Sequence, residues 1–308
     1  MSAVLALLIA VALDRAFGEP PNAIHPVAWM GSVIARGRDW ALRPARIGQF
    51  VRGAAVALTL PLVCAALAFA AAHAVSRWTI LSIVVTALLL KPLFAIRALR
   101  DAAFLVRDAL AAEDVALARS QLASLCSRNA SELEPPALIA ATVESIAENA
   151  SDSIVAPFFY FALAGLPGAA FYRAGNTLDA MIGYHGRYEW VGKTAARLDD
   201  VLNVLPARIT ALLFLLVAPL AGGNLRRGVA ILWRDGARTE SPNAGRPMAT
   251  MAGLLGIRLE KSGHYALGDT TRPIEAADIT RAWRIVSGAA YASAALTALG
   301  LIAMKRLS

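Results

Sequence analysis

The sequence is poor in cysteine, histidine and charged residues. Two cysteines and four histidines among 308 residues are too few and too scattered for a disulfide framework or a zinc site. Charged residues make up 17% of the chain and hydrophobic residues 57%, and the mean hydropathy is +0.55. A single soluble core cannot hide that much apolar surface, so the composition predicts a protein embedded in a lipid bilayer.

A phosphate-binding loop is missing as well, although "GRYEWVGKT" (residues 186–194) resembles one. The working motif has about four residues between its first glycine and its GK[ST] ending, and here there are five. Tyr188, Glu189 and Trp190 are bulky or acidic where the chain should wrap closely around an anion. We interpret the segment as a polar connection between helices.

The net charge of +8 does not indicate a nucleic-acid partner. A nucleic-acid-binding surface would interleave basic and aromatic residues in one stripe, whereas the arginines here lie between apolar runs. Arg-rich connections beside membrane helices mark the cytoplasmic side. The expected location is therefore the inner (cytoplasmic) membrane, which the chain crosses several times.

Several apolar runs are long enough to cross a hydrocarbon layer of about 30 Å. Val51–Val75 and Ile285–Met304 predict two spans. Thr79–Leu99 predicts a third, in which Lys91 must lie near an interface or face protein. Ser2–Leu13 is shorter, and we expect a retained helix because it has neither a basic start nor a clear small-residue cleavage site.

Two further apolar stretches are interrupted. Ile154–Phe171 contains "AGLPG", which leaves halves of about ten residues that are too short to span alone. Val201–Leu220 carries Asn203, Pro206 and Arg208, and such segments are tolerated where they face protein or line a cavity. The expected fold is an all-α integral membrane protein with a single domain over residues 1–308. We expect a bundle of about four to six membrane segments, some of them re-entrant, with cytoplasmic helical and loop segments.

Polar segments connect these runs. Asp14–Arg52 contains "GEPPNAIHPVAWMG", in which three prolines and two flanking glycines rule out a continuous helix, so we expect an ordered or partly ordered loop. From Ile96 to Ser153 the composition predicts polar helices with a break at Pro135-Pro136.

Three acids form a stripe in "ESIAENASDS". Glu144, Glu148 and Asp152 are four residues apart, so a helix carries them on one face with Asn149 beside them. A solvated helix face normally interleaves bases, and none occurs in this segment. Hard oxygen ligands of this kind suit Mg²⁺, whose shell is completed by water and phosphate. We therefore favour a magnesium site over the alternative, an exposed acidic helix.

Two more polar clusters follow. In "RAGNTLDAMIGY", Asn176 and Asp179 are three residues apart and face the same way on a helix. "ARLDDVLNVLPAR" adds Arg197, Asp199, Asp200, Asn203 and Arg208. Helix capping is the alternative explanation for one of the two adjacent aspartates. "SPNAGRP" (residues 241–247) is a turn whose asparagine and glycine allow unusual dihedrals and free N–H groups, and plain punctuation of the chain is the alternative there.

Five motifs together resemble one family: "DRAFGEPPNAIHPVAWMG", "ESIAENASDSIVAPFFY", "YRAGNTLDAMIGY", "ARLDDVLNVLPARIT" and "SPNAGRPMATMAGLLGIRL". The chain is similar to the adenosylcobinamide-phosphate synthases (CobD/CbiB family) from about Asp14 to about Gly268. The resemblance implies a membrane enzyme without a P-loop, which uses ATP and Mg²⁺ to join a propionate carboxylate of adenosylcobyric acid to aminopropanol or its phosphate. It also implies contact with the lipid bilayer and with other membrane enzymes of cobalamin assembly, and an active site facing the cytoplasm.

On this resemblance we assign roles to the motif residues. The expected metal ligands are Glu144, Glu148 and Asp152. The expected catalytic residues are Glu148, Asp152, Asp179, Asp199 and Asp200, and one of the last two takes the proton of the incoming amine. The expected contacts to substrate or phosphate are His25, Asn149, Asn176, Tyr184, Arg197, Arg208 and Asn243. Glu19 and Ser153 depart mildly from the family's usual residues, and His185 lies where the family frequently has a basic residue.

Two rival interpretations belong to other classes. "ENASD" also resembles the Asp-rich motifs of membrane prenyl- or phosphotransferases that bind magnesium pyrophosphate, although such enzymes generally carry two acid-rich motifs and no His25-Pro26 loop. A regulatory membrane protein similar to AmpE-type sensors would be expected to lose the acids and the Asn243 turn, which are intact here.

Overall fold

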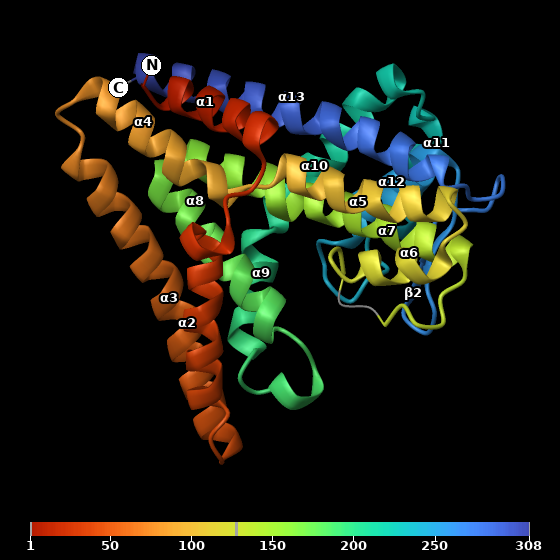
Figure 1. Cartoon of the computed structure of the whole chain (residues 1–308), viewed down its shortest axis with the longest axis horizontal. Coiled ribbons are helices and arrows are strands. Elements are labelled where there is room, and N and C mark those ends of the chain that lie inside the picture. Colours follow the sequence, from red (N-terminus) through yellow and green to blue (C-terminus); the bar gives the residue numbers. More distant parts are fainter. Residues whose placement is uncertain (1, 127–128, 308) are drawn as a thin grey trace. The chain divides into compact units, whose positions relative to one another are not determined.

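The computed structural model describes residues 2–126 and 129–307. Nearly all of the regular structure is helical (Figure 1), as the sequence predicts. The α-helices are α1 Ser2–Phe17, α2 Pro26–Ala41, α3 Arg46–Ala74, α4 Thr79–Leu90, α5 Ile96–Ala111, α6 Val115–Leu122, α7 Pro135–Ala150, α8 Ala156–Ile182, α9 Lys193–Leu202, α10 Val204–Val217, α11 Leu225–Asp235, α12 Gly245–Leu255 and α13 Ala277–Leu307. Short helical turns are η1 Asn22–Ile24, η2 Lys91–Leu93, η3 Ser151–Val155, η4 Gly186–Tyr188 and η5 Ala218–Ala221, and the strands are β1 Leu259–Lys261 and β2 Tyr265–Leu267.

Five helical segments are long and apolar enough to cross a membrane: Arg46–Ala74, Thr79–Ala111, Pro135–Ile182, Val204–Ala221 and Ala277–Arg306. They overlap the predicted apolar runs from Val51 onward, and by length and composition they confirm a multi-span helical fold. In the first of them only 11% of the apolar window is buried inside the protein, which leaves a surface suited to lipid. The N-terminal run is helical as predicted but belongs to α1, which has only 16 residues.

The connection between α1 and α3 is more helical than the sequence predicted. Irregular backbone and the turn η1 are confined to residues 18–25 and 42–45, and α2 begins at Pro26. A proline in the first turn of a helix costs no hydrogen bond, because the missing N–H has no intrahelical partner there. His25 caps α2, since its Nδ1 accepts from Val27 N at 3.2 Å. The expectation of a loop throughout Asp14–Arg52 is therefore wrong.

The acid stripe lies where a long helix widens. α7 passes at Ser151 into the π-helical turn η3 and continues as α8. Pro157 offers no N–H to the carbonyl four residues before it and its ring collides with that carbonyl, which a wider turn relieves. Such π turns frequently occur at functional sites. The predicted interruption at "AGLPG" is confirmed, because α8 bends where Gly165 adopts φ 62°, a conformation that favours glycine.

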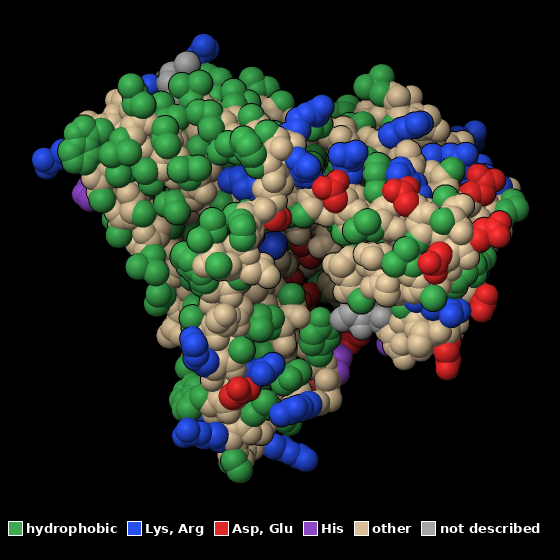
Figure 2. All heavy atoms as spheres, in the orientation of Figure 1, with side chains coloured by type: hydrophobic (Ala, Val, Ile, Leu, Met, Phe, Trp, Pro, Cys, Tyr) green, Lys and Arg blue, Asp and Glu red, His purple; other side chains and the backbone are tan. Residues whose placement is uncertain are grey.

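The helices form two compact units, each assembled from separate parts of the sequence. Unit 1 comprises the described parts of residues 1–95, 156–203 and 294–308. The connection before α9 packs so closely on α3 that a glycine is required: a Cβ on Gly53 would lie 2.1 Å from the carbonyl oxygen of Val191. Figure 2 shows apolar side chains gathered over α1 and α4, a surface suited to lipid. One core cluster of unit 1 joins α2, α3, α8 and α9 through Ile34, Ala41, Ala57, Leu178, Ile182, Val191 and Ala195.

Unit 2 comprises the described parts of residues 96–155 and 204–293. The predicted helix break before Pro135 is confirmed, because α7 begins there. The strands pair antiparallel with Leu259 opposite Leu267, and Gly263 in the turn between them has φ 74°. One core cluster of unit 2 joins α5, α6 and α7 through Val106, Ala109, Ala118, Leu122, Ala130, Leu138 and Ala141.

Candidate functional site

In unit 1 the carboxylate of Asp199 is held by two amide side chains. Asn176 on α8 donates from Nδ2 to Asp199 Oδ1 at 3.2 Å, and Asn203 donates to Oδ2 at 2.9 Å. Both amides are oriented by other donors. Tyr172 donates its hydroxyl to Asn203 Oδ1 at 2.9 Å, and Arg173 donates to Asn176 Oδ1 at 3.4 Å. Each amide therefore turns its NH₂ group towards the carboxylate.

Burial and neutral hydrogen-bond donors act in opposite directions on the pKa of Asp199. Burial is the largest influence and raises its pKa, the hydrogen bonds from Asn203 and Asn176 lower it, and the charge of Asp200 raises it again. The result is a pKa raised to about 6. At pH 7 the group is mostly ionised but close to its pKa, which is the condition for taking up and returning a proton.

Close packing of α8 on α9 holds this arrangement in place. A Cβ on Gly175 would lie 3.1 Å from Leu202 Cδ1, so the two helices leave little room between them. Tyr172 is fully buried and stacks on Tyr160 with ring centroids 5.1 Å apart. Tyr160 in turn donates its hydroxyl to the carbonyl of Leu202 at 2.9 Å. The orienting groups are thus fixed by the core of unit 1.

Two of the other predicted residues of this part of the chain are exposed. Arg197 is exposed and pairs with Asp200 at 3.3 Å. Tyr184 is exposed as well. Asp179 lies against the chain at Gly183, where a Cβ would be 1.9 Å from its Oδ1. Their catalytic and substrate-binding roles stay predictions.

Unit 1 contains a second polar cluster that the sequence did not predict. Lys91 is buried directly after α4, and its Nζ lies 3.1 Å from Asp14 Oδ1 and 2.9 Å from Glu19 Oε2. His25 Nε2 lies 2.9 Å from the same oxygen of Glu19. Lys91 therefore faces protein, one of the two predicted alternatives. Both ring nitrogens of His25 make contacts within the protein, and its role towards substrate stays a prediction.

In unit 2 the acid stripe is buried at one end and partly exposed at the other. Glu144 is buried in α7, and its Oε2 accepts from the hydroxyl of Tyr265 at 3.3 Å. Glu148 is half-buried one turn later, and Asp152 is half-buried in η3. The amide of Asn149 donates to the backbone of the preceding turn at 3.0 Å. The stripe is thus not the fully exposed acidic face that was the alternative.

The acid stripe suits magnesium only with help from other ligands. Across residues 2–126 and 129–307, no three His, Cys, Asp or Glu side chains are grouped as a metal site would require. The stripe instead offers carboxylate oxygens on successive turns. This donor set fits Mg²⁺ held by one or two carboxylates, with water and phosphate filling the remaining positions.

Arg208 and Asn243, far apart in sequence, meet in unit 2. Arg208 on α10 donates from Nη1 to Asn243 Oδ1 at 3.4 Å and to the carbonyl of Val204 at 2.6 Å. The predicted turn is confirmed, with Asn243 buried in it, and α12 begins within the motif at Gly245. Thr239 closes the turn by accepting from Gly245 N at 3.0 Å. A guanidinium beside an amide suits an anionic substrate group.

The loop that resembles a phosphate-binding motif is a packed connection between α8 and α9. A Cβ on Gly192 would lie 1.7 Å from the carbonyl oxygen of Ile182, so glycine is required there for packing. Lys193 begins α9, with its Nζ 3.8 Å from Glu189 Oε1 and 5.4 Å from the ring centroid of Trp190. The strands that the structure describes, β1 and β2, both follow it in sequence, so no described strand leads into this loop.

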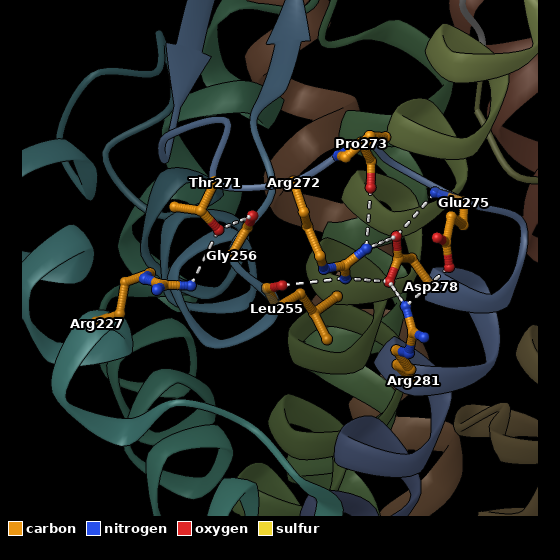
Figure 3. Close-up of polar contacts among 9 residues, drawn as sticks. All are labelled: Arg227, Leu255, Gly256, Thr271, Arg272, Pro273, Glu275, Asp278 and Arg281. Atoms are coloured by element: carbon orange, nitrogen blue, oxygen red, sulfur yellow. Dashed lines mark hydrogen bonds and ion pairs between the residues drawn. The ribbon is translucent and has the colours of Figure 1, made fainter.

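A buried aspartate at the start of α13 fastens part of unit 2 (Figure 3). Asp278 accepts from Arg272 at 2.9 Å, from Arg281 at 2.8 Å and from the backbone N–H of Glu275 at 2.9 Å. Arg272 also donates to the carbonyl of Leu255 at 3.1 Å, which ties this cluster to α12. These contacts hold the start of α13 against the segment before it and against α12.

Sequence reasoning assigned no role to three groups that the structure brings to the candidate residues. Asn203 follows Asp199 by one helical turn, and that spacing could have placed it beside the carboxylate. Tyr172 precedes Asn176 by the same spacing but looks like an ordinary core residue. No sequence pattern indicated Tyr265, because it contacts Glu144 from a hairpin more than a hundred residues later in the chain.

Comparisons with known proteins agree on one family. The model of the family described as CobD/Cbib protein matches residues 7–286. "Cobalamin biosynthesis protein CobD" of Dehalococcoides mccartyi is 45% identical over 280 residues, which is 89% of each chain. "Probable cobalamin biosynthesis protein CobD" of Methanothermobacter thermautotrophicus is 44% identical over 87% of this chain and 88% of its own. "Cobalamin biosynthesis protein CobD" of Klebsiella pneumoniae is 38% identical over 92% of each chain. No solved structure matches.

Proposed function

Because the chain belongs to the CobD/CbiB family of cobalamin biosynthesis, we propose that it is an adenosylcobinamide-phosphate synthase. The reaction is ATP-dependent formation of an amide between adenosylcobyric acid and aminopropanol or its phosphate, on the cytoplasmic side of the inner membrane. The observation that carries the chemistry is the oriented carboxylate of Asp199, whose pKa of about 6 suits proton transfer near neutral pH.

The proposed reaction has two steps, since a free carboxylate has no good leaving group. A propionate oxygen of the corrinoid attacks the terminal phosphorus of ATP, the bond to ADP breaks, and an acyl phosphate forms. The amine nitrogen then attacks the acyl carbon, the carbon–oxygen bond to phosphate breaks, and the nitrogen gives up a proton. Asp199 accepts that proton, and Asn176 and Asn203 hold its two oxygens in position.

The remaining candidates bind charged parts of the substrates. Arg208 with Asn243, and the exposed Arg197, offer donors for phosphate or for the corrinoid's carboxylates. When Mg²⁺ is bound, Glu144, Glu148 and Asp152 would hold it directly or through its waters, and it would neutralise charge on the ATP phosphates.

The test is an assay of purified protein with ATP, Mg²⁺ and adenosylcobyric acid, in which aminopropanol and its phosphate are supplied separately. We expect ADP release that depends on the corrinoid and on one of the two amines, with an equal amount of amide product identified by mass spectrometry. ADP release without the amide, or no turnover with either amine in protein that melts cooperatively, would contradict the proposal.

A further inference from the structure

The β-hairpin of unit 2 brings a polar side chain to the acid stripe, which comprises Glu144, Glu148 and Asp152. Tyr265 on β2 donates its hydroxyl to Glu144 Oε2 at 3.3 Å and lies 3.9 Å from Met248 Sδ of α12. Tyr265 is half-buried and Glu144 is buried. The two residues are 121 positions apart in the chain, so the contact exists only because the hairpin packs on the helix.

Strand β2 places Tyr265 on its inward side. Side chains two residues apart lie on one face of a strand, and Leu267, two residues after Tyr265, is fully buried. Leu267 pairs with Leu259, which is fully buried as well, and β1 packs against α7. The tyrosine ring therefore points towards α7, because two buried leucines fix the face of the hairpin.

Both ends of β2 are fastened. Before its start, His264 N donates to the carbonyl of Lys261 at 2.9 Å and closes the turn. After its end, Gly268 adopts φ 77° and donates its N–H to Asp235 Oδ2 at 2.8 Å. A Cβ on Gly268 would lie 2.5 Å from the carbonyl oxygen of Ile257. The strand is short but held in place, so its tyrosine can fix the orientation of a partner.

The hydroxyl of Tyr265 orients Glu144 without adding a charge. A tyrosine hydroxyl donates one hydrogen bond as a neutral group, unlike the arginines that hold Asp235 and Asp278. This contact therefore orients the carboxylate but does not neutralise it. Partners that orient a metal-binding carboxylate change metal affinity or activity by roughly 10- to 100-fold.

A buried hydroxyl within the acid stripe also points to a ligand. Ser151 follows Glu148 by three residues and precedes Asp152, and it is 2% exposed. Its Oγ has no hydrogen-bond partner among residues 2–126 and 129–307. A buried polar group in that state normally has a water or an ion beside it. Together with carboxylates on successive turns, this favours a hydrated cation over a purely structural cluster of acids.

We propose that Tyr265 is a positioning residue, whose hydroxyl holds Glu144 in the orientation in which the acid stripe binds a divalent cation. The inference rests on the proposed function, which assigns Mg²⁺ to the same three acids. It adds the hairpin to the site. It also gives Glu144 its role at the buried end of the stripe, while Glu148 and Asp152 lie at the more open end.

The test measures cation binding by the purified full-length protein in detergent, without ATP, corrinoid or amine. Mn²⁺ replaces Mg²⁺, because the electron paramagnetic resonance signal of free Mn²⁺ falls as the ion binds. Tyr265→Phe removes the hydroxyl and keeps the ring. Tyr291→Phe is the matched control, since it makes the same change at an exposed position of α13. The melting temperature of each variant without metal reports its folding.

Tyr265→Phe should raise the dissociation constant of Mn²⁺ at least about tenfold. Its melting temperature should stay within about 4 °C of wild type, and Tyr291→Phe should change neither quantity. Glu144→Gln should weaken binding at least as much as Tyr265→Phe. Adding Tyr265→Phe to Glu144→Gln should weaken binding less than about twofold further, because the hydroxyl acts through that carboxylate.

Wild-type affinity in Tyr265→Phe would overturn the proposal, and so would an undiminished further loss in the Glu144→Gln background. A large loss of melting stability in metal-free Tyr265→Phe would also overturn it, because the hydroxyl would then belong to the fold. Absence of saturable Mn²⁺ binding by the wild type would do the same. Mn²⁺ binding that depends on Tyr265, in protein that makes no amide, would support this inference and contradict only the proposed function.

Discussion

Two aspartates of this protein are held in opposite ways. Asp199 in unit 1 is half-buried and accepts from two neutral amides, and desolvation leaves its pKa raised to about 6. Asp235 in unit 2 is fully buried, and burial is the largest single influence on its pKa and acts to raise it. There, hydrogen bonds from Arg234 and the backbone of Gly268, together with the charges of Arg234 and Arg238, outweigh burial and lower the pKa. The arginines therefore keep Asp235 ionised, whereas the neutral amides leave Asp199 able to gain and lose a proton near neutral pH.

The largest effect should follow from removing the charge at Asp199. Asp199→Asn keeps the shape of the side chain but cannot accept a proton, and general-base catalysis contributes roughly 10²- to 10⁴-fold. We expect amide formation to fall about 1,000-fold. Initial rates of ADP release and of corrinoid product provide the measurement.

The same variant should fold at least as well as the wild type. A raised pKa means that the folded state disfavours the ionised form, so this group costs stability as the pH rises from about 4 to about 6. Asp199→Asn should therefore melt at a higher temperature than the wild type at pH 7, and the gap should close below pH 4. A lower melting temperature at pH 7 would mean that the carboxylate is structural.

Asp235→Asn should show the opposite pattern. It removes the buried carboxylate that accepts from Arg234 and from the backbone N–H of Gly268, and losing a hydrogen bond to a charged group costs about 1.5 to 3 kcal/mol. Because the folded pKa of Asp235 is lowered, its stabilisation is present above about pH 4 and is lost as the pH falls through the folded value. Thermal melting between pH 3 and pH 8 tests this, and turnover per folded molecule should stay within about threefold of wild type.

The acid stripe should be catalytic more than structural. Glu148→Gln or Asp152→Asn keeps the size of the side chain and removes the charge that Mg²⁺ needs, and metal stabilisation of a transferring phosphate is worth several kcal/mol. We expect turnover to fall at least about 100-fold, with partial rescue at high Mg²⁺. Wild-type turnover in both variants would remove these residues from the site, and loss of melting stability together with activity would assign them to the fold.

The smallest effect is expected at the loop that resembles a phosphate-binding motif. Lys193 contacts Glu189 and Trp190 and begins a helix. Lys193→Ala should therefore leave ATP-dependent turnover within about tenfold, or less than about 1.4 kcal/mol of transition-state stabilisation. Arg187→Ala in the same connection serves as the control. A thousandfold loss confined to Lys193→Ala, in folded protein, would restore a phosphate-binding role.

Periodicity and composition were sufficient for most of the fold. Apolar length predicted the spans, and Pro135 and Gly165 marked the break and the bend, because proline and glycine act on the backbone locally. The sequence did not predict α2, because a proline can either interrupt a helix or occupy its first turn. In the structure the cap at His25 shows that Pro26 begins a helix. At the candidate site, spacing along one helix placed Asn176 with Asp179. The contact between Asn176 and Asp199 depends on how α8 packs against α9, which the sequence pattern does not encode.

The most direct test of the account is the dependence of kcat/KM for the amine on pH. If Asp199 takes the proton of the attacking amine, the wild type should lose activity on the acid side with an apparent pKa of about 6. Asn203→Ala removes a hydrogen bond that lowers this pKa, so it should move the acid limb to higher pH, and the residual activity of Asp199→Asn should lack that limb. An acid limb near pH 6 that persists unchanged in Asp199→Asn would contradict the account.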